Sequence, residues 1–168
     1  ITTTGFGFGN TVDWPLFSQF ILLLLMCIGG SAGSTAGGFK VIRCMITARI
    51  AKNQILSTLS PNRVLTLHVN GQTLDKDTQH KVLKYLAIYT IIIVALIFIV
   101  SFDNNNFMTV VSGVLSCFNN IGPMIGTTDS FSIFNPLSKF LLSLAMIAGR
   151  LEIYPMLLLF LPKTWSKR

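Results

Sequence analysis

Two short glycine-bearing runs have the composition of an ion pathway that is lined by backbone carbonyls. One is Asn-Asn-Ile-Gly-Pro at residues 119–123, and the other is Thr-Thr-Thr-Gly-Phe at residues 2–6. Each lies beside a long apolar segment, which is how a narrow cation filter can be built in a membrane protein. The alternative for residues 119–123 is an extracellular loop in which Asn and Gly make turns. The residues predicted to line the filter are Thr3, Thr4, Gly5, Asn120, Ile121 and Gly122.

A second unusual stretch carries five glycines among residues 29–38. It does not fit a phosphate-binding loop, because that pattern needs Gly-Lys-Ser/Thr in succession and Phe39 separates Gly38 from Lys40 here. Each glycine costs about 1 kcal/mol relative to Ala in a helix interior, so a break between two half-helices is expected. The break is interpreted as a gate, with a close helix crossing as the alternative. The predicted gating loop comprises Gly33, Ser34, Thr35, Ala36, Gly37 and Gly38.

Arg150 lies near the middle of the last apolar segment, residues 131–161. A cation at that depth of a bilayer costs several kcal/mol unless it faces a cavity or a partner. Glu152 is two positions away and therefore points from a different face of the helix. Arg150 is predicted to meet carbonyls of the gating loop or to stand in the pathway as an electrostatic barrier. A structural arginine held by neighbouring helices is the alternative.

The composition indicates that these residues are positioned by membrane helices. Hydrophobic residues make up 51% of the 168 residues and charged residues only 11%, and the mean hydropathy is +0.65. A soluble domain of this size would have too little polar surface to cover itself. Residues 85–102 carry no charge and would span roughly 27 Å, close to the hydrocarbon thickness. Together with residues 14–30 and 131–161, they predict three crossings in the lipid bilayer.

Lysine and arginine gather in two of the connections between these crossings. Residues 1–13 and 101–131 contain neither. This asymmetry predicts that residues 43–84 and the C-terminus are cytoplasmic and that both glycine-bearing runs are outside. Because the asymmetry explains the net charge of +7, no nucleic-acid partner is expected. The clustered cations are Lys40, Arg43, Arg49, Lys52, Arg63, Lys76, Lys81 and Lys84 in the first group and Lys163, Lys167 and Arg168 in the second.

The segment before the run at 119–123 has the pattern of a helix that is too short to cross. Apolar residues recur at helical spacing over residues 106–118, but a helix of this length reaches only about 18 Å. Asp103 or Asn104 is expected to cap it. It is predicted to be a re-entrant pore helix whose partly negative C-terminal end points at the pathway and favours a cation there.

The pattern predicts an all-α membrane protein built from helix, pore helix, filter and helix repeats, of which about one and a half are present. Residues 1–59 would end one repeat, with its filter and its broken inner helix. Residues 60–80 would form a cytoplasmic linker, in which Asn70-Gly71 favours a short hairpin. Residues 81–168 would form the next repeat. Within that repeat the predicted parts are an outer helix at 82–102, the pore helix at 106–118, the filter at 119–123 and an inner helix at 134–161.

These motifs, taken together and in this order, resemble the Trk/Ktr/HKT superfamily of potassium transporters, most closely its TrkH-type membrane subunits. The resemblance covers essentially the whole chain as the C-terminal part of such a protein. Thr-Thr-Thr-Gly-Phe at 2–6 is similar to the third filter, and Asn-Ile-Gly-Pro at 120–123 to the fourth. The strings at 33–43 and 149–153 are similar to the broken inner helix of the third repeat and to the last helix.

The resemblance implies four repeats around one pore, with potassium as the transported ion and no bound cofactor. Carbonyls around Gly5 and Gly122 would coordinate the ion, and Arg150 would lie close to the gating loop. The implied partners are the missing N-terminal repeats, a second copy in a homodimer and a cytosolic nucleotide-binding regulatory subunit. The implied location is a bacterial plasma membrane.

Two other functions are weighed against potassium uptake. A sodium-coupled or sodium-permeable transporter of the same superfamily is the first. A membrane-embedded enzyme is the second, and it is disfavoured because the chain shows no membrane-placed histidine, no paired carboxylates and no nucleophile with an evident base.

Overall fold

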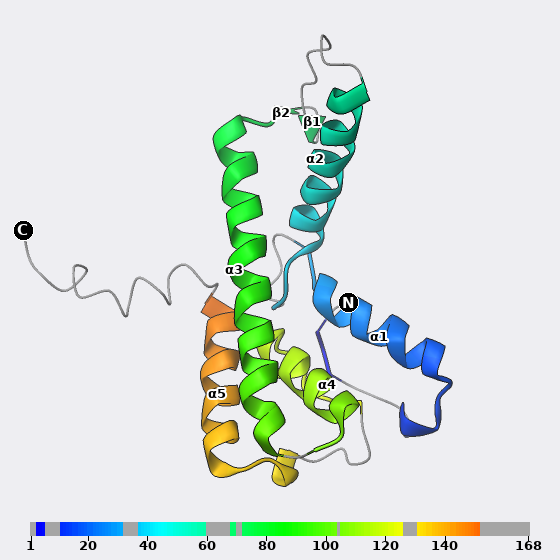
Figure 1. The fold of residues 1–168 in the computed structure, drawn as a ribbon, viewed down its shortest axis with the longest axis vertical. Coiled ribbons are helices and arrows are strands. Elements are labelled where there is room, and N and C mark those ends of the chain that lie inside the picture. Colours follow the sequence, from blue (N-terminus) through cyan, green and yellow to red (C-terminus); the bar gives the residue numbers. More distant parts are fainter. Residues whose placement is uncertain are drawn as a thin grey trace, which may run out of the picture.

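The computed structural model describes residues 3–5, 11–31, 37–59, 68–69, 72–103, 105–125 and 131–151 of the chain. Its elements are five α-helices, α1 (Leu16–Ile28), α2 (Val41–Leu59), α3 (Lys76–Val100), α4 (Phe107–Phe118) and α5 (Pro136–Leu151), and the strands β1 (His68–Val69) and β2 (Gln72–Thr73). Short 3-10 turns lie at Thr11–Asp13, Ser101–Asp103 and Phe131–Ile133. Figure 1 shows α3 as the axis, with α2 beside one half and α5 beside the other.

Helix α3 is the one described helix that is long and apolar enough to cross a bilayer. It begins at Lys76, earlier than the start predicted at residue 82, because the charged turns before the apolar segment continue the same helix. One face packs inward through Tyr85, Tyr89 and Val100, while Ile91 and Phe98 are about two-thirds exposed, at 66% and 67%. An exposed face of large apolar side chains suits contact with lipid or with further membrane helices.

Helix α4 is short and is buried almost all round, which suits a helix surrounded by protein rather than lipid. It packs against α3, α5 and α1, and Val110, Val114 and Phe118 are at most 2% exposed. The prediction that Asp103 caps this helix is wrong, because the N-cap is Asn106 with no side-chain hydrogen bond. Asn104 lies outside the described residues.

Asp103 instead joins the C-terminal end of α3 to the start of α5. Its carboxylate accepts hydrogen bonds from the backbone N–H and the side-chain amide of Asn135, at 3.1 and 2.8 Å. Asn135 directly precedes Pro136, a residue whose fixed φ suits the first turn of a helix. This contact ties the start of α5 to the end of α3, and α4 packs against both helices.

Helices α1 and α2 are separated by the glycine-rich stretch and do not form one straight helix (Figure 1). Because α1 has only 13 residues, it is too short to cross a bilayer alone, so the crossing expected over residues 14–30 does not consist of this helix by itself. Beyond α2, β1 pairs antiparallel with β2 in a register of His68 with Thr73 and Val69 with Gln72. The register fits the short hairpin expected there, although Asn70 and Gly71 themselves lie outside the described residues.

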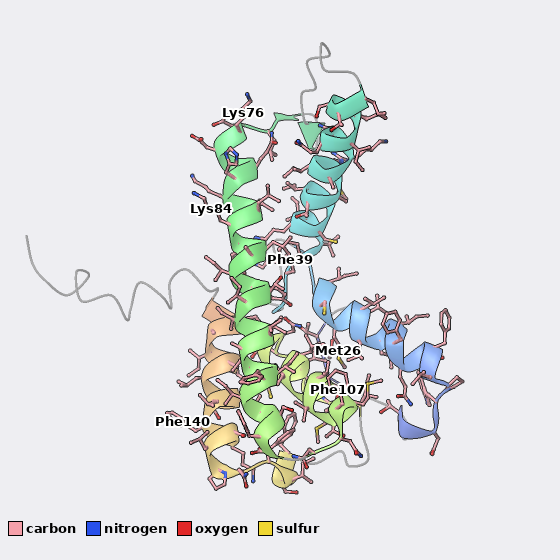
Figure 2. All side chains as sticks on the ribbon, in the orientation of Figure 1. Met26, Phe39, Lys76, Lys84, Phe107 and Phe140 are labelled. Carbon is pink, nitrogen blue, oxygen red and sulfur yellow. The ribbon has the colours of Figure 1, made fainter. Side chains whose placement is uncertain are left out.

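Figure 2 shows the side chains that these helices carry and where the two ends of the fold differ. Lys76 and Lys84 project from the end of α3 that lies beside α2, whereas Phe107 and Phe140 lie at the other end. The cationic end contains the hairpin connection, and the opposite end contains α4 and the start of α5. Helix α4 and the basic connection therefore lie at opposite ends of α3.

Candidate ion filter and the broken inner helix

Two buried serines of α4 hold the chain that follows the helix. The Ser116 hydroxyl oxygen accepts a hydrogen bond from the backbone N–H of Gly122 at 3.0 Å. One turn earlier, the Ser112 hydroxyl donates to the carbonyl of Ile125 at 2.6 Å and accepts from its N–H at 2.9 Å. Both serines are 0% exposed. Residues 120–122, called here the filter segment, are therefore fixed along the surface of α4.

These hydrogen bonds determine where the carbonyls of the filter segment point. The N–H of Ile121 donates to the backbone carbonyl of Ser116 at 2.9 Å, and the next N–H, that of Gly122, donates to the Ser116 hydroxyl. In a trans peptide the C=O points opposite to the N–H, and the described residues contain no cis peptide. The carbonyls of Asn120 and Ile121 therefore both point away from the last turn of α4, whereas in an extended strand successive carbonyls alternate.

Backbone angles of the left-handed region make this arrangement possible, and they recur in residues 3–5, called here the N-terminal segment. Asn120 and Gly122 have φ of 54° and 108°, while Thr3 and Gly5 have φ of 53° and 77°. In each segment the residue between them is not in this region. Positive φ is uncommon for residues other than glycine and collects at functional sites. The two glycine-bearing runs thus share one unusual backbone pattern.

The structure brings the two segments together, backbone against backbone. A Cβ atom added at Gly5 would collide with the carbonyl oxygen of Ile121. A Cβ atom added at Gly122 would lie 4.0 Å from the Cα of Gly5, in otherwise open space. Gly5 is therefore required by a close approach as well as by its φ. Gly122 is required by its φ alone, and its surface is exposed.

The ends of the glycine-rich break are joined to each other by backbone hydrogen bonds. The N–H of Phe39 donates to the carbonyl of Cys27 at 3.3 Å, and that of Val41 donates to Gly30 at 3.0 Å. Residues 26–30 and 37–41, which these bonds hold together, are called here the neck. A Cβ at Gly37 would collide with the backbone carbonyl of Asn119. The neck therefore rests directly on the residue that precedes the filter segment.

Helix α5 approaches the same region through a glycine. A Cβ at Gly149 would collide with the carbonyl oxygen of Phe118, the last residue of α4. The Asn120 side-chain amide donates to the Met146 carbonyl at 3.1 Å, on the neighbouring turn of α5. Arg150 is the next residue after Gly149 and is exposed. Arg150 thus belongs to the turn of α5 that contacts the end of α4.

Comparison with known proteins decides the family. The family described as "TrkH: Cation transport protein" matches residues 1–167. The chain belongs to the TrkH family. It is 34% identical to the Trk system potassium uptake protein TrkH of Escherichia coli K12, a match that covers 99% of this chain and 35% of that protein. It is 33% identical to the Trk system potassium uptake protein TrkG of the same strain, over 98% and 34% of the two chains.

A solved structure of this family has the same fold. The crystal structure of the potassium transporter TrkH from Vibrio parahaemolyticus superposes with a TM-score of 0.88 at 32% identity, over 98% of this chain and 36% of that one. The all-α membrane fold expected from the sequence is therefore confirmed. The chain spans about 35% of the length of its TrkH relatives, in keeping with the expectation that further repeats of the family belong to the complete pore.

Within this TrkH-type fold, the predicted filter residues of the two runs lie in contact, and the predicted loop adjoins them in part. Gly5, Ile121 and Gly122 lie together, and Gly37 and Gly38 pack against Asn119. The other predicted loop residues, Gly33, Ser34, Thr35 and Ala36, lie outside the described residues. The ion contacts assigned to these residues and the role of Arg150 stay predictions.

Several residues that shape this site were not predicted from the sequence. Ser112 and Ser116 are four positions apart in an otherwise apolar short helix, a spacing that puts both on one face. That spacing is a signal that could have found them. Tyr89 donates a hydrogen bond to the Asn119 side chain at 2.9 Å, but nothing local in the sequence distinguishes it from Tyr85 one turn earlier. Long-range partners of this kind require the fold.

Proposed function

We propose that the complete protein takes up potassium ions across the cytoplasmic membrane through a channel-like pore, without covalent catalysis. Backbone carbonyls of the N-terminal segment and the filter segment replace water around the passing ion. In each segment the proposed ion contacts come from the backbone. They belong to Thr3, Thr4 and Gly5 in the first segment and to Asn120, Ile121 and Gly122 in the second.

The observation that carries this proposal is the alignment of the Asn120 and Ile121 carbonyls. The N–H groups on the far side of these two peptides, those of Ile121 and Gly122, both donate to Ser116. The two carbonyl oxygens therefore face the same way, and that of Ile121 lies against Gly5. The C-terminal end of α4 adds a partial negative charge beside them. Fixed oxygen dipoles of this kind suit a dehydrated monovalent cation. The relatives named as potassium uptake proteins support potassium as that ion.

The break between α1 and α2 is proposed to be the gate. The neck adjoins the residue before the filter segment, and this contact supports a gate close to the proposed ion path. Its glycines and small polar residues suit a mobile obstruction. Arg150 is proposed to act as an electrostatic barrier or as a partner of this loop, because its turn of α5 touches the end of α4.

In the proposed assembly, this part of the chain lies beside further repeats of the same protein. Because it covers about 35% of its relatives, N-terminal repeats of the same protein would supply the rest of the filter. A homodimer is proposed, together with a cytosolic nucleotide-binding regulatory subunit that docks on the basic end. Arg49, Lys52 and Lys81 are exposed there, on α2 and α3. The membrane is proposed to be a bacterial plasma membrane with the C-terminus in the cytoplasm.

The experiment that tests this function is ion flux through the full-length protein in proteoliposomes. Uptake of potassium, rubidium and sodium is measured under equal gradients. We expect potassium and rubidium to enter faster than sodium. Equal sodium and potassium rates would instead support the sodium-permeable alternative, and an absence of flux of any of the three ions would contradict transport by this pore.

Removing the Ser116 hydroxyl is expected to weaken potassium selectivity while the protein still folds. In Ser116→Ala the Gly122 N–H loses its acceptor, so the peptide that carries the Ile121 carbonyl is no longer held toward Gly5. The loss of a hydrogen bond from a partly buried donor costs about 0.5–1.5 kcal/mol, so the preference for potassium over sodium should fall by roughly two- to tenfold. The measurement is the ratio of potassium to sodium uptake.

Ser138→Ala is the matched control, because Ser138 is also a buried serine, 1% exposed, but belongs to the first turn of α5. Its selectivity should equal that of the wild type. A Ser116→Ala protein with unchanged selectivity would contradict the role given to the Ile121 carbonyl.

A further inference from the structure

Asn119 is a fully buried polar residue whose side chain is bound on both sides. Its exposed fraction is 0%. The side-chain oxygen accepts a hydrogen bond from the Tyr89 hydroxyl of α3 at 2.9 Å, and the amide nitrogen donates to the carbonyl of Met26 in α1 at 2.8 Å. The Asn119 N–H continues α4 by donating to Leu115 at 3.0 Å. One side chain therefore joins three helices.

The Met26 carbonyl is at the entry of the break, and the exit of the break touches Asn119 as well. Gly37 packs against the Asn119 backbone carbonyl, and a Cβ at Gly38 would lie 3.5 Å from its side-chain oxygen. Figure 2 shows Met26 near the end of α1 and Phe39 just before α2. Both ends of the neck thus rest on one buried residue, which is adjacent in the chain to the filter segment.

The position of the Tyr89 hydroxyl is itself fixed by packing. The Tyr89 ring lies 5.3 Å from that of Phe118 and 5.7 Å from that of Phe39, between centroids. Phe39 belongs to the neck, and Phe118 is the last residue of α4. Movement of the neck would therefore disturb the same ring whose hydroxyl holds Asn119. This arrangement connects the break and the end of the pore helix by contacts that are all buried.

We propose that Asn119 is a positioning residue. Its side-chain amide holds the neck in the closed position and, at the same time, holds the filter segment in its selective geometry. The inference rests on the proposed function, because it assigns a filter to residues 120–122 and a gate to the break. An amide suits this position since it offers a donor to Met26 and an acceptor to Tyr89 together. Leucine of similar size offers neither.

The test uses the full-length protein in proteoliposomes with two readouts, the potassium flux without any activator and the ratio of potassium to sodium uptake. Asn119→Leu is expected to raise the unstimulated flux roughly tenfold and to lower the uptake ratio by a similar factor, since one buried and one partly buried hydrogen bond are lost. Tyr89→Phe removes one of them and keeps the bond to Met26. It should shift both readouts in the same directions by about threefold.

The double variant Asn119→Leu/Tyr89→Phe distinguishes a shared positioning role of the two side chains from a general loss of packing. If the two side chains act as one unit, the double variant behaves nearly like Asn119→Leu alone, because the Tyr89 hydroxyl then keeps only its longer contact with the Cys27 carbonyl, at 3.5 Å. Additive effects would overturn the inference, as would a change of only one readout. If Asn119→Leu does not fold, Tyr89→Phe decides by the same criterion, namely that both readouts shift.

The matched control is Thr109→Val, which removes a hydroxyl that is equally buried in α4, 1% exposed, but forms no hydrogen bond. It should resemble the wild type in both readouts.

Failure of the inference is distinguishable from failure of the proposed function. If Gly122→Ala lowers selectivity while Asn119→Leu and Tyr89→Phe do not, only the inference is wrong. If Gly122→Ala also leaves selectivity unchanged, the assignment of residues 120–122 as a filter is contradicted, and with it the proposed function.

Discussion

Replacing Gly5 with alanine is expected to abolish the preference for potassium over sodium. The added methyl group would collide with the Ile121 carbonyl oxygen, and that neighbour is backbone, which cannot turn aside as the end of a side chain can. The φ of 77° adds strain for any residue with a Cβ. Because this carbonyl is one of the two aligned toward the proposed pathway, its displacement should lower the uptake ratio by at least about tenfold, to near unity. Ion flux in proteoliposomes measures this ratio.

Gly122→Ala is the informative comparison for Gly5→Ala. Its φ of 108° is also unfavourable for alanine, but the nearest atom to the new methyl group would be the Gly5 Cα at 4.0 Å. We expect a smaller loss of selectivity, about fivefold, which corresponds to about 1 kcal/mol of backbone strain without a collision. If Gly5→Ala were the milder of the two variants, the close approach of the two segments would not govern the filter.

Replacing Gly149 with alanine is expected to cause the largest loss of stability among the glycine substitutions in the helices. Its methyl group would collide with the carbonyl oxygen of Phe118 and would also approach the Asn120 side-chain nitrogen at 3.0 Å. Relief requires α5 to move away from α4, which opens the packing of both helices. We expect a cost of about 3 kcal/mol or more, at the upper end of the range for overpacking. Thermal unfolding of the purified protein in detergent measures it.

Gly113→Ala provides the matched control, because Gly113 is also inside a helix and gains the same helix propensity from alanine. There the methyl group would meet the tip of the Phe134 ring at 3.2 Å, and a ring can shift by a few tenths of an ångström. We expect a change in melting temperature close to zero. Equal destabilisation by the two substitutions would show that backbone contact at Gly149 is not the cause.

Much of this fold could be predicted from local patterns. The short helix before the filter segment was expected over 106–118, and α4 occupies Phe107–Phe118, because apolar spacing and length are both local properties. The two-residue hairpin follows from Asn70-Gly71 in the same way. Boundaries were less predictable. The start of α3 was placed late because hydropathy marks the membrane segment and not the charged turns that precede it.

The contacts that shape the candidate site were beyond local reasoning. Asp103 was expected to cap α4, yet its carboxylate is taken by Asn135, far along the chain. Capping and long-range hydrogen bonding compete for the same oxygen atoms, and only the packing of α5 beside α3 decides between them. The sequence also identified Gly5 and Gly122 as related, but not that the oxygen of Ile121 lies between their segments.

The bond between Asn119 and Met26 has a consequence for how such a protein is made. The two residues are 93 positions apart, so α1 and the glycine-rich break leave the ribosome well before the amide that holds them. Until α4 has been inserted, the neck lacks its contacts with Asn119. If the break is the gate proposed above, this gate gains its support only late in biosynthesis, after α4 has been inserted.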